Sequence, residues 1–186
     1  MIGSVPASAQ AWVAALAAVG YFADQRMATA VHLAVTLQRP LLLEGAPGVG
    51  KTELAKAISI VLGRDLVRLQ CYDGLDERDA LYEWNYAAQM LHARLRQETQ
   101  SAAEIEQSLY SSEYLIERPL LKALQAPAPG AVLLIDELDR ADEPFEAFLL
   151  EYLGEFQVSI RAFKTVRAAN TPVTLLTSNR SRELND

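Results

Sequence analysis

The chain has 186 residues, of which 51% are hydrophobic and 22% charged, a composition that suits one globular domain with a sizeable core. Its net charge of −7 and pI near 4.9 argue against a dedicated nucleic-acid-binding protein, because such proteins usually carry a basic surface. The single cysteine, Cys71, excludes an internal disulfide framework and fits a reducing compartment.

The first forty residues predict a helical segment. Phe22, Met27 and Val31 partly mark one apolar face, and Arg39-Pro40 is expected to end the helix, since proline disfavours helix in the residue before it. No Lys or Arg precedes Arg26, so the basic region of a secretory signal is missing, and no apolar stretch approaches the length of a membrane span. We therefore expect a cytoplasmic protein without a membrane span.

Residues 45–52 read Gly-Ala-Pro-Gly-Val-Gly-Lys-Thr, a complete G-x-x-x-x-G-K-T phosphate loop. An apolar run at 41–43 precedes it and predicts a buried strand, and residues 53–61 carry apolar side chains at helical spacing. In this motif the loop N–H groups and the helix N-terminus face the phosphates, the lysine reaches the β- and γ-phosphates, and the threonine hydroxyl binds Mg²⁺. The alternative is a glycine loop with only a structural role. The sequence thus predicts ATP and Mg²⁺ as cofactors, with nucleotide contacts from Gly45, Ala46, Pro47, Gly48, Val49, Gly50, Lys51, Thr52 and Glu53.

The middle of the chain gives weaker signals. Gly63 is expected to cap the helix after the phosphate loop, residues 66–71 alternate enough to form a second strand, and residues 72–74 form a turn. Residues 75–128 contain no clear strand and predict several helices. Within them, residues 97–112 are rich in Gln, Glu and Ser, which indicates an exposed helix or a mobile insertion. The isolated histidines, His32 and His92, lack metal-ligand spacing and are interpreted as ordinary helix residues.

A continuous apolar run at 131–135 predicts a central parallel strand covered on both faces, and it leads into Asp136-Glu137. Because Mg²⁺ prefers oxygen ligands, Asp136 suits the metal together with Thr52. A second carboxylate one residue later points elsewhere, so Glu137 suits a base that polarises water for attack on the γ-phosphate, with Lys51 as a further catalytic group. The alternative is that acidic residues simply favour a helix N-terminus.

Residues 144–153 predict a helix with proline in its first turn, and residues 157–160 and 165–167 look like two arms of a hairpin. A further buried strand is expected at 173–177. It leads into Ser178-Asn179-Arg180. The Asn179 amide would orient the attacking water, although Ser-Asn after a strand is also a common turn. Exposed arginines commonly form salt bridges on the surface. Three could instead contact phosphate or a neighbouring subunit, namely Arg140, Arg180 and Arg182. Alternating strands and helices predict an α/β fold with a mostly parallel sheet and its ligands at the carboxyl ends of the strands.

These residues together resemble the AAA+ ATPases, and within them the MoxR group. The resemblance is carried by the phosphate loop, by residues 133–141 (Leu-Leu-Ile-Asp-Glu-Leu-Asp-Arg-Ala) and by residues 177–180 (Thr-Ser-Asn-Arg), and it covers the chain from about Tyr21 onward. Residues 69–86, which include Gln-Cys-Tyr-Asp-Gly-Leu-Asp and Tyr-Glu-Trp-Asn-Tyr, are similar to the CoxD-like branch. That branch is associated with maturation of molybdenum-containing carbon monoxide dehydrogenases and related hydroxylases.

The resemblance implies a three-layer αβα AAA+ core over residues 40–186, preceded by the helical segment 1–39. It implies that Glu137 is the catalytic base, that Asn179 is the sensor 1 residue and that residues 157–167 are the hairpin preceding sensor 1. An insertion within the second core helix should lie between Gly74 and about Asn85. Both insertions would face the pore of a homo-oligomeric, hexameric ring. Protein remodelling, a von Willebrand factor A domain partner and a metalloenzyme client are implied as well.

The family's arginine finger and helical lid with sensor 2 would lie beyond Asp186. Because an arginine finger is worth on the order of 10³–10⁵ in rate elsewhere, we expect this polypeptide to bind nucleotide, hydrolyse it poorly and assemble weakly. Other functions stay open: a nucleotide-binding regulatory module with little turnover, a small-molecule kinase, and a DNA-remodelling ATPase. The DNA reading is supported only by basic residues of the hairpin, from Arg161 to Arg167. Glu137 and Asn179 favour hydrolysis.

Overall fold

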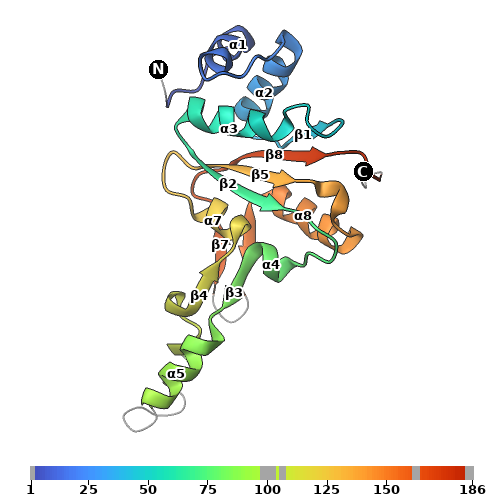
Figure 1. Cartoon of the computed structure of the whole chain (residues 1–186). Coiled ribbons are helices and arrows are strands. Elements are labelled where there is room, and N and C mark those ends of the chain that lie inside the picture. Colours follow the sequence, from blue (N-terminus) through green and yellow to red (C-terminus); the bar gives the residue numbers. More distant parts are fainter. Residues whose placement is uncertain (1–2, 97–103, 105–107, 161–163, 183–186) are drawn as a thin grey trace.

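A central sheet of four parallel strands organises the computed structural model, which describes residues 3–96, 104, 108–160 and 164–182. The strand order is β1–β8–β5–β2, so every connection along the chain crosses over through a helical layer (Figure 1). The strands are β1 (Leu41–Glu44), β2 (Asp65–Gln70), β5 (Ala131–Asp136) and β8 (Val173–Ser178). The predicted α/β fold with a mostly parallel sheet is confirmed.

Strand β5 shows why this sheet lies in the middle of the molecule. All six of its residues are buried, and successive side chains point to opposite faces. Val132 and Leu134 join the core under one helical layer, whereas Leu133 and Ile135 join the core under the other. Burying each such side chain contributes roughly 1.5–3 kcal/mol, so a continuous apolar run is stable only between two layers.

The first helical layer consists of α1 (Ala9–Ala18), α2 (Gln25–Leu37) and α3 (Lys51–Leu62). Gly63 caps α3 with a left-handed φ of 60°, as predicted. Two details of the N-terminal expectation are wrong. Helix α2 already ends at Leu37, because Gln38 takes the left-handed conformation that stops it before Arg39-Pro40. Phe22 lies between α1 and α2 and is 87% exposed, so it is not part of the apolar face.

The second layer covers the opposite face with α4 (Glu77–Leu81), α7 (Pro119–Gln125) and α8 (Glu143–Glu155), together with the short helix η2 (Leu138–Arg140). Helix α8 begins where the Asp142 side chain accepts a hydrogen bond from Phe145 N, at 3.0 Å, and Pro144 occupies its first turn. The expected helix at 144–153 is therefore confirmed. None of the helices in the described part of the chain is long and apolar enough to cross a membrane.

An arm projects from the second layer and corrects the expectation of no strand between residues 75 and 128. Strands β3 (Tyr82–Trp84) and β4 (Leu115–Glu117) pair antiparallel, and α5 (Tyr86–Arg96) and the short helix η1 (Ser112–Tyr114) extend them (Figure 1). The arm leaves the core after Leu81 and returns at Arg118, whose N–H donates to the Leu81 carbonyl at 3.1 Å. This excursion is longer than the insertion expected between Gly74 and Asn85. Most of the segment 97–112 lies outside the described residues.

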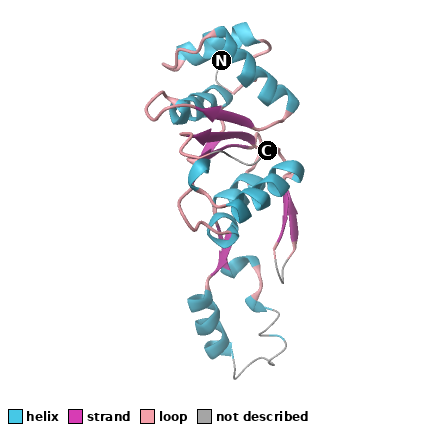
Figure 2. Ribbon diagram, turned by 90° about the vertical axis from the view of Figure 1, so that its right-hand side faces the viewer, coloured by secondary structure: helices cyan, strands magenta, loops and turns pink. Residues whose placement is uncertain are grey.

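A β-hairpin precedes β8, as predicted. Its strands are β6 (Gln157–Ser159) and β7 (Thr165–Arg167), with Val158 opposite Val166. Figure 2 shows this hairpin and the arm reaching away from the central sheet in the same direction. Residues 161–163 of the predicted hairpin, which include the basic residue Arg161, lie outside the described residues. The predicted boundary between the helical segment 1–39 and the core 40–186 stays a prediction.

Candidate functional site

The parallel strands bring the candidate residues to one edge of the sheet. The phosphate loop follows β1, Asp136 and Glu137 lie at the end of β5, and Asn179 follows β8. Together with part of β2, they surround a hollow of about 270 Å³. It is lined by Pro47, Gly48, Gly50, Lys51, Thr52, Glu53, Arg68, Asp136, Glu137 and Asn179.

The phosphate loop needs its glycines for a backbone reason. Gly48 and Gly50 have φ values of 81° and 91°, a region that residues with a Cβ atom rarely adopt. Gly50 is the N-cap of α3, so the free N–H groups of the first turn of that helix lie next to the loop. Such a loop and helix N-terminus form an anion-binding geometry. Glu53, in the same turn, pairs with Lys56 at 2.6 Å on the exposed side of α3.

The Lys51 ammonium connects the loop to the end of β8. Its Nζ atom donates to the carbonyls of Gly45 at 2.6 Å and Ala46 at 3.0 Å, and to Asn179 Oδ1 at 2.9 Å. Lys51 and Asn179, which are 128 positions apart, thus touch directly. Because its three N–H donors are used by two loop carbonyls and by Asn179, Lys51 must leave some of these partners before it can bind an anion.

The Asp136 carboxylate is almost entirely buried and is surrounded by hydroxyl groups. Thr52 Oγ1 lies 3.3 Å from both of its oxygens, and the Thr177 hydroxyl makes a short hydrogen bond to Oδ1. The same Thr177 oxygen accepts the Glu137 N–H at 2.9 Å. The sequence analysis assigned no role to Thr177, although a buried-strand threonine two positions before Asn179 was a usable signal.

Arg68 is a second contact that sequence reasoning missed. Its Nε and Nη2 atoms donate to Asp136 Oδ2 at 3.0 and 2.6 Å. The register of β2 against β5 explains this contact, because Gln70 lies opposite Asp136 and Arg68 shares a face of β2 with Gln70. The arginine side chain is 51% exposed, whereas that of Asp136 is 6% exposed.

Glu137 takes a backbone conformation that is uncommon for its residue type. Its φ of 57° and ψ of 48° are left-handed, and its N–H bond to Thr177 helps to hold this turn. The turn separates the direction of its side chain from that of Asp136. The Glu137 carboxylate forms an ion pair with Arg140 Nε at 3.0 Å. Arg180 instead pairs with Glu44 at 3.4 Å on the surface, which is the commoner role considered for it.

A buried carboxylate, Asp139, fixes the chain that follows β8. It accepts hydrogen bonds from the N–H groups of Asn179 and Ser181, both at 3.0 Å, and from the Ser181 hydroxyl. Burial raises the pKa of Asp139, but the hydrogen bonds from Ser181 and Asn179 outweigh it, so the pKa lies below its ordinary value. Arg182 adds contacts to the Asp139 and Ala141 carbonyls and to the buried Glu146. Arg182 therefore has a structural role here.

The donor set at Asp136 fits Mg²⁺. Thr52 and Asp136 offer a hydroxyl and a carboxylate close together, and Mg²⁺ favours oxygen ligands while keeping several waters. Among the described residues, no cluster of three or more His, Cys, Asp or Glu side chains could hold a metal without further ligands.

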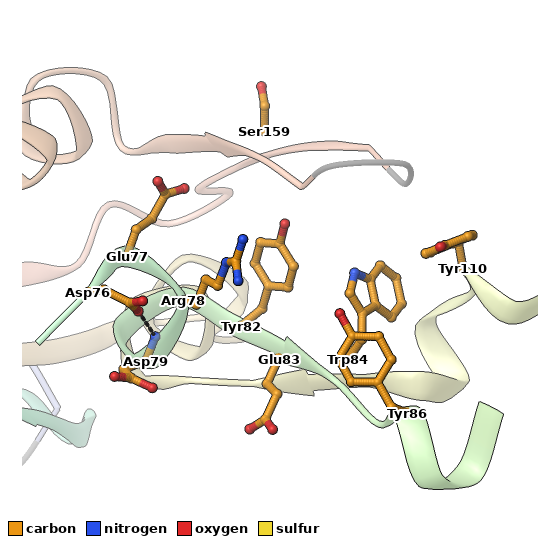
Figure 3. Close-up of a pocket in the computed structure, with 10 residues that line it drawn as sticks. All are labelled: Asp76, Glu77, Arg78, Asp79, Tyr82, Glu83, Trp84, Tyr86, Tyr110 and Ser159. Atoms are coloured by element: carbon orange, nitrogen blue, oxygen red, sulfur yellow. Dashed lines mark hydrogen bonds between the residues drawn. The ribbon is translucent and has the colours of Figure 1, made fainter. Parts of the chain in front are cut away.

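Two other hollows adjoin the sheet and the arm. One of about 410 Å³ shares Lys51 with the site and is lined by Tyr21, Met27 and the half-exposed Leu42 and Val49. The other, of about 690 Å³, lies between the arm and the hairpin and shares no lining residue with the site. Figure 3 shows the second, with Tyr82 and Trp84 on the side facing Ser159, and Asp79 and Glu83 turned away from it.

Comparison with known proteins agrees with this geometry. Residues 40–185 match the model of the AAA domain (dynein-related subfamily). A stretch of 48 residues, which is 26% of this chain and 1% of midasin, is 48% identical to midasin of Giardia intestinalis. The crystal structure of a candidate ATPase from Cytophaga hutchinsonii has a similar fold, with a TM-score of 0.52 and 20% identity over 82% of this chain and 37% of that chain. The chain belongs to the AAA domain family, in its dynein-related subfamily.

Proposed function

We propose that the chain binds ATP with Mg²⁺ and hydrolyses it. The observation that carries this proposal is the meeting of Lys51, Thr52, Asp136, Glu137 and Asn179 at one edge of the sheet, with Lys51 2.9 Å from Asn179 and Thr52 3.3 Å from Asp136. Membership of the AAA domain family supports the same nucleotide. The neighbouring hollow beside Tyr21 would take the base, since it adjoins Lys51 and most of its lining residues are apolar.

Each residue then has a defined task. The loop N–H groups and Lys51 bind the phosphates, and Thr52 and Asp136 hold the cation. Bound Mg²⁺ would neutralise charge on the phosphate oxygens. Glu137 accepts the proton of the attacking water, and the Asn179 amide orients that water. For this, Glu137 must first leave Arg140, and Lys51 must leave the loop carbonyls.

The ion pair between Arg140 and Glu137 favours one alternative, a nucleotide-binding regulatory module with little turnover. In the described structure Arg140 Nε pairs with Glu137 Oε2 at 3.0 Å, so one of the two carboxylate oxygens of the proposed base is occupied. A module of this kind would bind ATP without releasing this ion pair. The two functions therefore differ only in whether Glu137 becomes available to water.

Fluorescent mant-ATP binding and phosphate release, measured on four chains, separate the two. Lys51→Ala should lose binding, whereas Lys56→Ala, an exposed lysine on the same helix, should bind normally. Glu137→Gln should bind mant-ATP as the unchanged chain does but release phosphate about 10²–10⁴-fold more slowly, the usual contribution of a general base. Binding without turnover above that of Glu137→Gln would leave only the regulatory module. Absence of nucleotide binding would refute both.

The wider setting rests on the resemblance of residues 69–86, 133–141 and 177–180 to MoxR proteins of the CoxD-like branch. We infer that the chain works in protein remodelling or in metalloenzyme maturation of the molybdenum hydroxylase type, in the cytoplasm. It would act as part of a hexameric ring with a von Willebrand factor A domain partner. Light scattering with and without ATP tests the ring, and a chain that stays monomeric with ATP at high concentration would contradict it.

A further inference from the structure

Asp136, the proposed ligand of the cation, already has a cationic partner. Both available donors on one edge of the Arg68 guanidinium, Nε and Nη2, bind the same carboxylate oxygen, Oδ2, at 3.0 and 2.6 Å. The other oxygen, Oδ1, accepts the Thr177 hydroxyl. Arg68 thus occupies one of the two carboxylate oxygens that lie 3.3 Å from the Thr52 hydroxyl.

Arg68 and the Thr52 hydroxyl approach this carboxylate from the same hollow. Thr52 Oγ1 lies 3.3 Å from Oδ2, and both residues line the 270 Å³ space beside the phosphate loop. A divalent cation held by Thr52 and Asp136 would thus meet the guanidinium at the same carboxylate. Two positive charges at one carboxylate repel each other, so the arginine and the metal compete.

The Arg68 side chain is exposed enough to leave this position. Its side chain is 51% exposed, and Nη2 also donates to Gln70 Oε1 at 2.6 Å, a partner available on the same face of β2. An arginine with a long, half-exposed side chain can move from one acceptor to another without the backbone moving.

We propose that Arg68 is a displaceable counter-charge, which neutralises Asp136 when no divalent cation is bound and gives up Oδ2 when one binds. Arg68 thereby sets how tightly the site holds the cation. This inference rests on the proposed function, because it assumes that Asp136 serves a metal. It differs from a permanent structural ion pair, which would not change with the metal. It also differs from a phosphate ligand, which would act on the nucleotide itself.

Electron paramagnetic resonance with Mn²⁺ in place of Mg²⁺ tests the competition. Mn²⁺ is titrated up to millimolar concentrations, with and without saturating ADP, into the unchanged chain, Arg68→Met and Arg68→Gln. The methionine keeps the length of the side chain without charge, and the glutamine keeps a polar group should methionine impair folding. Arg118→Met, which removes a half-exposed ion pair to Glu83 in the arm, is the matched control.

Both Arg68 variants should bind Mn²⁺ about three- to tenfold more tightly, while Arg118→Met should not change, because a half-exposed charge-assisted pair is lost from the competition. Unchanged or weaker Mn²⁺ binding in the Arg68 variants would overturn the proposal. So would a loss of mant-ATP affinity measured in EDTA, since that identifies a phosphate ligand. If the unchanged chain binds no mant-ATP, the proposed function fails, and the titration without nucleotide still decides the role of Arg68.

Discussion

Removing the buried carboxylate of Asp139 should destabilise the chain substantially. Asp139→Ala deletes the acceptor for the N–H groups of Asn179 and Ser181 and for the Ser181 hydroxyl. A hydrogen bond to a charged group contributes about 1.5–3 kcal/mol, but Ser181 is exposed and water can replace part of its two bonds. We therefore expect the free energy of unfolding to fall by about 2–4 kcal/mol at pH 7.

Urea unfolding followed by circular dichroism measures this loss, with Asp73→Ala as the matched control. Asp73 lies in an exposed turn, and its removal should change stability by less than about 0.5 kcal/mol. Because the pKa of Asp139 lies below its ordinary value of 3.8, its contribution is present above that pH and disappears as the pH falls through the folded-state pKa. The difference in free energy of unfolding between Asp139→Ala and Asp73→Ala should therefore narrow below about pH 4. An Asp139→Ala chain as stable as Asp73→Ala at pH 7 would refute the reasoning.

Two further predictions concern buried polar groups. Thr177→Val keeps the shape of the side chain but leaves the Glu137 N–H and Asp136 short of a partner, so the free energy of unfolding should fall by about 1–3 kcal/mol. Thr177→Ser keeps the hydroxyl and should lose much less. Equal losses in the two variants would contradict the hydrogen-bonding role. Burial, reinforced by the charge of Asp136, raises the pKa of Cys71 from 9.0 to about 12, so its contribution is complete below pH 9 and is lost as the pH rises toward 12. At pH 10 this loss should amount to about 1.4 kcal/mol, and it should be absent from Cys71→Ala in urea unfolding at pH 8 and 10.

The parts of the fold that the sequence predicts well are those with local signals. The apolar run of β5, the phosphate loop between β1 and α3, and the alternating pattern of β2 all lie within a few consecutive residues. The rule that ligands gather at the carboxyl ends of parallel strands then predicts that Lys51, Asp136 and Asn179 lie near one another. The structure brings these three together, while their roles in binding and catalysis stay predictions.

The parts that escaped prediction depend on pairing between distant residues. Strands β3 and β4 have three residues each and meet across more than thirty positions, too short a pattern for periodicity to reveal. Arg68 reaches Asp136 only because β2 lies in one particular register against β5. A shift by one residue would turn its side chain to the other face of the sheet. The Arg140 ion pair depends on the left-handed turn at Glu137, which glutamate rarely adopts.

The narrow base of the arm has a consequence for how the molecule can vary. The chain leaves the core after Leu81 and returns to it at Arg118. A backbone hydrogen bond of 3.1 Å, from the Arg118 N–H to the Leu81 carbonyl, closes that base. When the ends of an insertion already meet, lengthening or shortening it changes the closure entropy only slowly with length. The outer part of the arm can therefore change in length at little cost in closure entropy, while Trp84 and Tyr114 at its base stay packed in the core.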